Sequence, residues 1–557
     1  MQAEYRCRFG KDTSLEEIIS KNAGQSVEEL LHPERSPYIS GLENAASLIR
    51  LHKEKGSEVT VIGDYDADGV LASAIMKMGL ERFFGHPVRV RLPKRFSEGY
   101  GMNMAMVDEI RSGLVITVDN GIAAAEEVKR AKEKGLDVIV TDHHLPPANG
   151  ILPDADVIVD PKATGRCGFD GYCGAGIAYR LVGCLVDDPQ LLEKLVVFAG
   201  IATVADVVEL HSDNRNLVND SCRLLNARHA TKGLNILTAY LGIEEVTESD
   251  YGFKIGPVIN ASGRLEDDGP SEVLELLTYD EVFFSPDMDR EMCALADKLI
   301  KRNEERKEMV TSSLGRIHVN PTESPIVVFD ELCSAGIIGI VAGKIAEQYN
   351  KPALVFCGTG DTVKGSGRSP GTINLKSMLD AASDLFIRYG GHAGAAGMTT
   401  YKKNLDSIQK QCANYLADKG LTGGTAHLYY DKEIRETDIP MILEELQQFR
   451  PFGQGNPQPV FKVGTFVLTE RSGKYGRYMG SDNQHIKLFG EECDVVGFDM
   501  AAKWHGDRVI GVYGTLSYNV FNGFKRPQIE MTDITTYKKE DSSLKKVLST
   551  LLTKKEI

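Results

Sequence analysis

Acidic residues directly follow short apolar runs at three places in the first part of this chain. The runs are VTVI at 59–62, LVI at 114–116 and DVIV at 137–140. Apolar runs of this length, alternating with helical patterns, are typical of buried parallel strands. Because the carboxyl ends of parallel strands meet at one edge of a sheet, we expect the acidic side chains to converge there. The chain is therefore predicted to begin with an α/β domain that carries a charged site.

Four segments supply the candidate side chains: GDYDADG at 63–69, TVDNG at 117–121, TDHH at 141–144 and TVADVVEL at 203–210. The candidate catalytic residues that they offer are Asp64, Asp66, Asp68, Asp119, Asp142, His143, His144 and Asp206. Carboxylates packed this closely repel one another and need a cation. Oxygen ligands suit magnesium or manganese, and the added imidazole favours manganese.

The first segment also resembles the first half of a calcium-binding EF-hand loop, in which Gly69 would take the sixth position. The twelfth position of that loop needs a bidentate glutamate, and here it is Ile75. The flanks are a strand-like run and an apolar segment rather than two polar helices. The sequence therefore favours a metal site at a strand end over an EF-hand.

The four segments, in this order, resemble the motifs of the DHH phosphoesterase family, which is named for the triplet found here at 142–144. The resemblance implies two divalent metal ions, manganese or magnesium. It implies that His144 faces the substrate phosphate, and we expect Asp119 to bridge the two ions. Two metals about 3.5–4 Å apart can bridge a hydroxide nucleophile and neutralise charge on the phosphoryl oxygens. The implied metal ligands are Asp64, Asp66, Asp68, Asp119, His143 and Asp206.

Further segments resemble the RecJ branch of this family and the DHH-associated C-terminal domain. They are LPKRFSEGYG at 92–101, IGPVINASGRL at 255–265, GIIGIVAGKIAE at 336–347, GSGRSPG at 365–371 and GGHAGAAGMT at 390–399. Glycines let the backbone approach a phosphate closely, and arginine binds phosphate through two N–H groups. The predicted substrate-binding residues are His144, Arg95, Asn260, Arg264, Ser366, Arg368 and His392.

The segment FRPFGQGNPQPVF at 449–461 resembles the beginning of the oligonucleotide-binding fold (OB-fold) of the RecJ branch. Short alternating runs follow it, as is typical of a small β-barrel. Such barrels bind single strands through a basic groove and stacking aromatic side chains. The available aromatic residues are Tyr475, Tyr478, Phe498, Tyr518, Phe521 and Phe524, of which we expect half or more in the core.

Two positions depart from the RecJ pattern. Val258 stands where the branch usually has an arginine ahead of its INAAGR stretch. Cys333 and Ser334 stand where it often has Trp-His ahead of its GVIGIVA segment. Both changes remove polar groups expected to contact DNA or its terminal phosphate, so we expect altered strand affinity or end preference with intact chemistry.

The predicted architecture is a parallel-sheet DHH catalytic α/β domain, joined by a long helix to a second α/β domain and followed by a small β-barrel. The connector helix is expected over 289–314, which contain no Gly or Pro. The N-terminal segment is expected to pack on the first domain, and the tail is expected to form a Lys-rich amphipathic helix. The predicted boundaries are 1–45 for the N-terminal segment, 46–215 for the catalytic domain, 216–318 for the helical region and connector, 319–425 for the DHH-associated domain, 426–540 for the OB-fold and 541–557 for the tail.

Composition limits the remaining choices. There is no run of 18 uncharged apolar residues and no apolar signal core at the N-terminus, so we expect no membrane span. We also expect a monomer, and the use of cysteine indicates the reducing cytoplasm. The 10 cysteines are scattered and are expected to be free thiols. The net charge of −15 argues mildly against tight binding of long DNA, although a locally basic groove still attracts a polyanion.

The sequence thus predicts a metal-dependent 5′→3′ exonuclease on single-stranded DNA, acting in DNA repair and recombination. A helicase and a single-strand-binding protein are partners that the family resemblance suggests. The alternative function is a phosphodiesterase for short oligonucleotides or cyclic dinucleotides, built on the same two α/β domains. The barrel argues against that alternative, because very small substrates do not need its reach.

Overall fold

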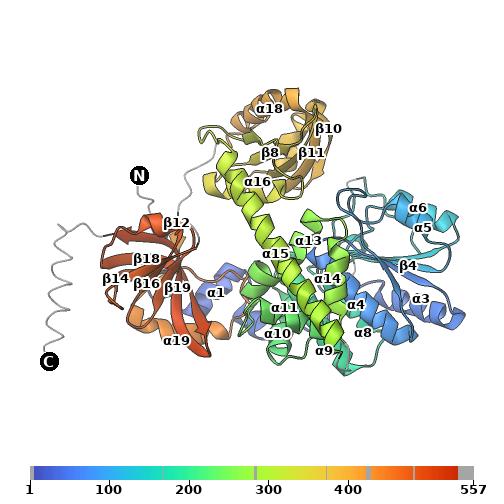
Figure 1. The fold of residues 1–557 in the computed structure, drawn as a ribbon, viewed down its shortest axis with the longest axis horizontal. Helices are drawn as coiled ribbons and strands as arrows, with labels where there is room; N and C mark the ends of the chain where they lie inside the picture. Colours follow the sequence, from blue (N-terminus) through green and yellow to red (C-terminus); the bar gives the residue numbers. More distant parts are fainter. Residues whose placement is uncertain are drawn as a thin grey trace.

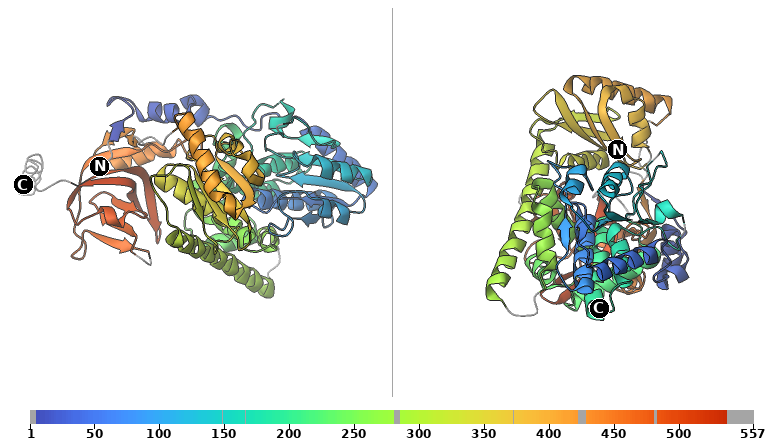
Figure 2. Two further views of the ribbon diagram at one scale, coloured as in Figure 1. Left: turned by 90° about the horizontal axis from the view of Figure 1, so that it is seen from above. Right: turned by 90° about the vertical axis from the view of Figure 1, so that its right-hand side faces the viewer.

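The computed structural model describes residues 5–147, 149–165, 167–280, 285–371, 373–421, 428–480 and 483–536. The amphipathic tail expected at 541–557 lies outside the described residues. Figure 1 shows a catalytic domain in blue and green, a second α/β domain above it and a red β-domain to one side. The two views in Figure 2 agree that the second domain lies over the catalytic domain and that α15 (Pro286–Arg316) runs along one side toward it.

The catalytic domain contains a parallel five-stranded sheet whose order is β3-β2-β4-β5-β6. Its central strands are the predicted apolar runs, and every residue of β2 and β4 is buried. Helices α3, α4 and α8 contribute to the core on one face, whereas α5 and α6 contribute to the core on the other. The strands are β2 (Val59–Ile62), β3 (Arg89–Arg91), β4 (Leu114–Val118), β5 (Asp137–Thr141) and β6 (Val157–Val159). The helices are α3 (Leu42–Lys55), α4 (Ala67–Phe84), α5 (Met104–Glu109), α6 (Ala125–Glu133), α7 (Pro161–Thr164) and α8 (Gly174–Gly183).

A helical region follows and leads into the predicted connector. The connector α15 is 31 residues long and packs on α11, α13 and α14, so it is both a link between domains and part of the first core. The other helices of this region are α9 (Pro189–Ala205), α10 (Ser212–Asn226), α11 (Lys232–Tyr240), α12 (Glu248–Asp250), the π-helical turn η1 (Tyr251–Ile255), α13 (Gly256–Leu265) and α14 (Gly269–Thr278).

The second α/β domain has a mixed five-stranded sheet in the order β10-β11-β9-β8-β7. Only β7 and β8 pair in parallel; the other neighbours are antiparallel. The strands are β7 (Ile326–Phe329), β8 (Ala353–Cys357), β9 (Thr362–Arg368), β10 (Phe386–Gly391) and β11 (Ala395–Tyr401). The helices are α16 (Ile338–Tyr349), α17 (Leu375–Asp380), η2 (Ser383–Leu385), η3 (Lys402–Asn404) and α18 (Leu405–Asp418).

The third domain is a curled seven-stranded sheet in the order β13-β14-β18-β19-β17-β16-β15, and it lies where the sequence predicts the OB-fold. The two long strands β18 and β19 are paired along their length near the middle of the sheet, and their register shifts between Tyr513 and Gly514. The elements are β12 (Leu428–Tyr430), β13 (Lys432–Ile434), η4 (Glu436–Asp438), α19 (Ile439–Gln447), β14 (Phe461–Val467), β15 (Gly476–Met479), β16 (His485–Phe489), β17 (Asp494–Gly497), η5 (Ala501–Lys503), β18 (Val509–Phe521) and β19 (Phe524–Thr536).

The N-terminal segment differs from the expectation, because most of it packs on the OB-fold domain. Strand β1 (Tyr5–Cys7) pairs in parallel with β12. Helices α1 (Leu15–Ala23) and α2 (Val27–Leu31) place Leu15, Ile19 and Leu30 in the core of that domain. Only the end of the segment, from Ile39 onward, joins the core of the catalytic domain. The amphipathic helices cover an apolar face that the neighbouring sequence alone does not reveal.

Two predictions from composition agree with the structure. All 10 cysteines are free thiols. None of the helices within the described ranges is long and apolar enough to cross a membrane.

Candidate active site

The first acidic segment joins β2 to α4 at the carboxyl edge of the sheet. Asp66 caps α4, because its carboxylate accepts a hydrogen bond from the Gly69 N–H at 3.1 Å. The helix therefore begins inside the acidic motif, a geometry that an EF-hand loop does not have. Asp64 is fully buried beside the turn and accepts the Tyr65 N–H at 2.8 Å.

The second acidic segment places Asp119 directly after β4, in a left-handed backbone conformation with φ of 60°. Aspartate tolerates this region better than most residues, and such outliers are common at functional sites. Gly174, the first residue of α8, approaches closely, since a Cβ there would lie 2.5 Å from the Asp119 Cβ. The N–H groups of Gly174 and Ala175 donate to Asp68 at 2.6 and 2.8 Å. The start of α8 thus holds Asp68 beside Asp119.

The third segment follows β5 and gives Asp142 a different role from the other acids. Its carboxylate accepts the N–H groups of Ile122 and His143 at 2.9 and 2.7 Å, and it bonds the His144 Nδ1 at 2.8 Å. Burial disfavours the charged form of His144, but the bond to Asp142 outweighs it and raises the His144 pKa to about 9. Asp142 therefore orients and charges His144 rather than facing the acidic cluster.

The fourth segment brings Asp206 to the same place from the end of α9. The next residue, Val207, has a φ of 59°, which is rare for a β-branched side chain. This strained turn separates α9 from the stretch that leads to α10. The predicted ligand is therefore presented from a backbone that the surrounding packing must hold in place.

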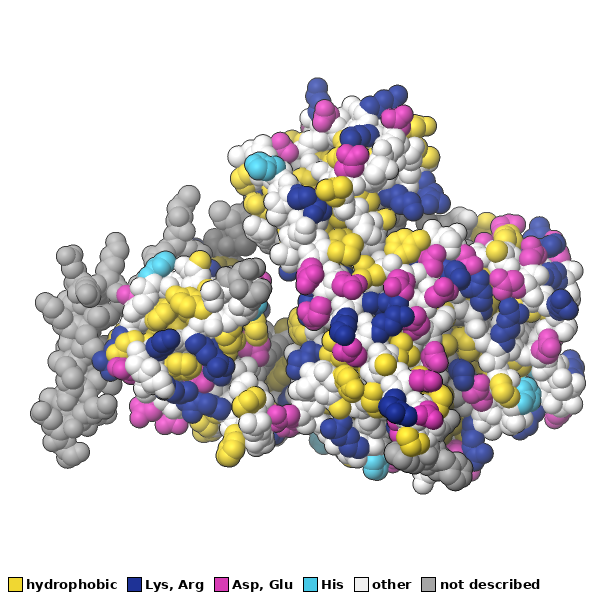
Figure 3. All heavy atoms as spheres, viewed as in Figure 1, with side chains coloured by type: hydrophobic (Ala, Val, Ile, Leu, Met, Phe, Trp, Pro, Cys, Tyr) yellow, Lys and Arg dark blue, Asp and Glu magenta, His cyan; other side chains and the backbone are white. Residues whose placement is uncertain are grey.

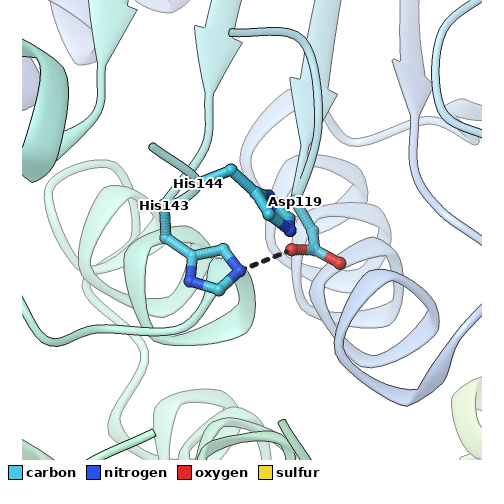
Figure 4. A group of neighbouring side chains, drawn as sticks. All are labelled: Asp119, His143 and His144. Atoms are coloured by element: carbon cyan, nitrogen blue, oxygen red, sulfur yellow. Dashed lines mark ion pairs between the residues drawn. The ribbon is translucent and has the colours of Figure 1, made fainter. Parts of the chain in front are cut away.

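The predicted metal ligands converge, and Figure 4 shows two of them, Asp119 and His143, with His144 beside them. The His143 Nε2 lies 3.1 Å from Asp119, 3.6 Å from Asp68 and 3.7 Å from Asp206. Three overlapping groups have ligand atoms within 4.8 Å of one another, and Asp119 belongs to two of them. These groups are Asp64–Asp66–Asp119, Asp68–His143–Asp206 and Asp119–His143–His144.

The chemistry of this donor set fits divalent metal ions. Among the described residues, Asp64 Oδ2, Asp119 Oδ1 and both ring nitrogens of His143 are buried without a hydrogen-bond partner. Burial and repulsion between carboxylates raise the pKa of Asp119 well above its ordinary value and that of Asp206 to about 8. Burial lowers the His143 pKa to about 4, which keeps its imidazole neutral and able to ligate. A bound cation would offset the repulsion between these buried carboxylates.

A cavity of about 1480 Å³ lies between the two α/β domains and reaches the acidic site at Asp142 and His144. Of the predicted substrate-binding residues, it is lined by His144, Arg95, Arg264, Ser366, Arg368 and His392. Asn260 is placed differently: its side-chain oxygen accepts the Ala67 N–H at 3.1 Å and so supports the start of α4. Burial and the nearby Arg95 lower the Arg264 pKa to about 10, so positive charges are crowded there.

Several cavity residues were not singled out from the sequence. Tyr65, Tyr100 and Arg388 all line the cavity. The Tyr100 hydroxyl lies 3.4 Å from the His144 Nε2, and its ring meets the Tyr65 ring edge-on at 6.2 Å. Both tyrosines stand inside the motifs at 63–69 and 92–101, so an aromatic residue within an acidic or glycine-rich loop was an available signal. Arg388 stands two residues before the glycine-rich segment at 390–399, outside the motif itself.

The positions that depart from the RecJ pattern do not line the cavity themselves, although Ala335, next to Ser334, does. Val258 is fully buried in the first core, and Cys333 is buried in the second domain. The Ser334 hydroxyl accepts the Gly336 N–H at 3.2 Å and shapes the turn before α16. Val258 and Cys333 thus pack in the hydrophobic cores of the two domains.

Comparison with known proteins gives matches along most of the chain. Family models match at 58–202 (DHH family, N-terminal domain), 323–418 (DHHA1 domain) and 430–533 (RecJ OB domain). A Bacillus subtilis protein named single-stranded-DNA-specific exonuclease RecJ is 32% identical over 524 residues, or 89% of this chain, which spans 63% of that relative. The Thermus thermophilus protein of the same name is 30% identical over 516 residues, covering 89% of this chain and 71% of the relative. The crystal structure of RecJ in complex with Mn²⁺ from Thermus thermophilus has a TM-score of 0.76 at 27% identity and covers 94% of this chain and 76% of that chain.

The two α/β domains and the acidic site at the sheet edge of the first define a protein of the DHH phosphoesterase class. With the OB domain and relatives over most of its length, the chain belongs to the RecJ family of single-stranded-DNA-specific exonucleases.

Proposed function

We propose that this chain is a metal-dependent exonuclease that removes nucleotides from the 5′ end of single-stranded DNA. The observation that carries the proposal is the juxtaposition of the overlapping ligand groups with a cationic cavity. A phosphodiester that enters the cavity meets arginine and lysine side chains on one side and His144, beside the acidic cluster, on the other. Family membership supports the substrate class, and the direction of attack is part of the proposal.

The ligand groups divide naturally into two metal positions. Asp64, Asp66 and Asp119 would hold one ion, and Asp68, His143 and Asp206 would hold the other, with Asp119 shared. When bound, such ions supply an activated hydroxide and neutralise charge on the phosphoryl and leaving oxygens. The chain's own contribution is to fix these ligands through the start of α8 and the cap of α4.

His144 is suited to hold the phosphate. Its pKa of about 9 keeps the ring protonated at neutral pH, with Nδ1 engaged by Asp142 and Nε2 directed at the Tyr100 hydroxyl 3.4 Å away. A phosphate oxygen close to this Nε2 would receive a charge-assisted hydrogen bond, which is stronger than a neutral one. Asp142 acts here as a positioning residue.

Arg368 is presented for phosphate binding from β9. Its Nη1 donates to the Ser366 hydroxyl and the Gly367 carbonyl at 3.1 and 2.8 Å, which fixes the plane of the guanidinium. A side chain at Gly339 would crowd the Nη2, since its Cβ would lie 2.9 Å away. The fixed fork can pair with two oxygens of one phosphate.

Tyr65 and Tyr100 offer surfaces for an unstacked base, and single strands present such bases freely. The Arg95 guanidinium already lies 4.9 Å above the Tyr65 ring. Figure 3 shows Lys and Arg side chains gathered on the OB domain, where a basic surface would hold DNA further along the strand. These features favour long single strands over the short-oligonucleotide or cyclic-dinucleotide alternative.

Digestion of single strands labelled at either end tests the proposal. Strands of about 30 nucleotides suffice, because one OB-fold covers roughly 4–16 nucleotides. With manganese, a 5′ label should appear at once in mononucleotides, whereas a 3′ label should pass through a ladder of shortening strands. A strand whose 5′ end is closed in a hairpin should resist cleavage. Immediate release of a 3′ label, or preference for dinucleotides, would replace the proposal by another phosphodiesterase activity.

The proposal also includes finer points drawn from the sequence. They are a monomeric state, a place in the cytoplasm, a role in repair and recombination, and partnership with a helicase and a single-strand-binding protein. Sedimentation of the protein with and without each candidate partner would test the first and last of these.

A further inference from the structure

The second α/β domain has an apolar strand at the edge of its sheet. Strand β7 is the last in the order β10-β11-β9-β8-β7, and its sequence is IVVF. Four successive apolar residues are typical of a strand buried within a sheet, not of an edge. Natural edge strands usually carry lysine, proline or a bulge that discourages further pairing, and these four residues include none of them.

The backbone of β7 has hydrogen-bonding groups on its open side. Ile326 and Asp330 direct their N–H groups toward β8, where they donate to Pro352 and Phe356 at 2.8 and 3.0 Å. Because this direction alternates along a strand, Val327 and Phe329 direct theirs away from β8. No residue in the described ranges accepts a hydrogen bond from either of these two groups.

A groove of about 370 Å³ runs along this open edge and touches all four residues of β7. Its other side is formed by the turns before β7 and the first part of α18. The Oε1 of Gln409 lies in this lining, buried and without a hydrogen-bond partner among the described residues. Two free donors of an edge strand thus face the same groove as an unsatisfied acceptor, which is what an added strand would engage.

Two acids, Glu323 and Asp406, lie on the rim of the groove, and the nearby Lys351 amino group donates to the backbone carbonyls of Pro321 and Glu323 at 2.7 and 3.0 Å. Glu323 has the Asn320 amide at 2.9 Å as its partner, and Asp406 is exposed in the first turn of α18. Neither acid forms an ion pair with a described cation. Lys402 lies 4.2 Å above the Phe329 ring at the far end of the strand. A lysine on the incoming segment could therefore pair with Glu323 or Asp406.

We propose that the open edge of β7 binds an extended segment of a partner protein, in which apolar residues alternate with lysine. The segment adds a sixth strand to the sheet, with its backbone bonded to Val327 and Phe329 and its lysine beside the acidic rim. The nuclease cavity is lined by β9, β10 and β11. Because β8 separates these strands from β7, a docked partner leaves the cavity open.

Fluorescence anisotropy with labelled peptides on the full chain tests this site. The probe is an acetylated octapeptide of alternating lysine and valine (a length of about twice the four-residue strand allows for register). One control replaces lysine by glutamate, and a second carries N-methyl groups on alternate amides, which preserves charge but blocks pairing. We expect the first peptide to bind and both controls to bind at least about tenfold more weakly. Equal binding of the methylated peptide would mean that mere attraction to an acidic protein explains the signal, and would overturn the proposal.

Two variants locate the contact on the protein. Val327→Pro removes an outward N–H without touching the bonds to β8, and Val327→Ala retains that N–H while trimming the same side chain. We expect peptide binding to be lost only in the proline variant, with unchanged cleavage of a short single strand in both. Binding by Val327→Pro as tight as that of the wild type would refute the site. If the proline variant fails to fold, Gln409→Leu replaces it, and retained binding there would be equally negative. Self-association of the wild type that disappears in Val327→Pro would replace the peptide by a second copy of this chain.

Discussion

Replacing Asp119 with asparagine should stabilise the metal-free protein and at the same time abolish its response to manganese. The side chain is 2% exposed, and its burial together with Asp68, Asp66, Asp206 and Asp64 raises its pKa well above the ordinary value. A carboxyl held neutral in the fold but charged when unfolded costs about 1.4 kcal/mol per pH unit above its unfolded pKa. Because the pKa of Asp119 is raised in the folded protein, this cost grows as the pH rises above the unfolded pKa, and asparagine removes it.

When manganese is bound, the substitution should instead make the protein less stable than the wild type. Manganese at 100 times its dissociation constant stabilises a binding protein by about 2.7 kcal/mol, and the variant should lose most of this gain. Loss of the shared ligand should lower turnover by roughly three orders of magnitude or more, since a metal clamp is worth several kcal/mol in the transition state. The two effects together separate a metal ligand from a residue that merely packs.

Thermal unfolding with EDTA and with manganese, followed by the rate of single-strand cleavage, measures both effects on the same samples. Asp154→Asn is the matched control, because Asp154 is an exposed acid of the same domain. It should change neither the unfolding temperatures nor the rate. The reasoning fails if Asp119→Asn keeps the manganese-induced stabilisation and cleaves within tenfold of the wild type.

Three further predictions follow from the other domains and the cavity. Arg368→Ala should raise the KM for a short 5′-phosphorylated strand by about 10- to 100-fold, because one charge-assisted contact is lost, and kcat should change less. Steady-state kinetics that match the wild type would contradict a phosphate contact. Asp494 is buried beside Arg471, Lys487 and Arg526, whose positive charges outweigh the effect of burial and lower its pKa. Asp494→Asn should therefore lower the free energy of unfolding by about 1–3 kcal/mol at pH 7. Urea titrations at several pH values should show this difference vanish as the pH falls through the lowered pKa. A chain cut to residues 36–421 should remain folded, cleave short strands and lose salt-dependent affinity for long strands. A chain cut to 1–421 should aggregate, because α1 and α2 lose the core that they cover. Equal binding of long strands by the full chain and the 36–421 chain would show that the OB domain does not hold DNA.

The position of the acidic site could be predicted from the sequence because the rule behind it is local. Each apolar run is long enough for one buried strand, and the acids follow at its carboxyl end. Parallel pairing, as between Ile62 and Thr117, then brings separate segments to one edge. The connector helix was equally predictable, since a stretch without Gly or Pro has few alternatives.

The features that the sequence did not reveal depend on contacts between distant segments. Helices α1 and α2 pack on a domain whose first strand lies far along the chain, and pairing of Tyr5 with Leu428 follows no local pattern. Arg215 is another example: it is 1% exposed and donates to the carbonyls of Leu30, Phe449 and Arg450, so it joins three parts of the chain. A lone arginine in a helix gives no hint of such partners.

Asn260 illustrates a limit of motif reasoning. Its place in the INASGRL segment predicts substrate contact, but its amide oxygen supports the turn that presents Asp66. A motif residue can therefore act through the backbone of the site. Tyr65 and Tyr100 show the converse, because they reach the cavity from motifs whose acids and glycines drew attention first.

Anomalous diffraction from crystals grown with manganese tests the central claim most directly. The account predicts two peaks about 3.5–4 Å apart, one near Asp64, Asp66 and Asp119 and the other near Asp68, His143 and Asp206. Both peaks should be lost or displaced in Asp119→Asn. A single peak, or peaks remote from Asp119, would contradict the two-metal site.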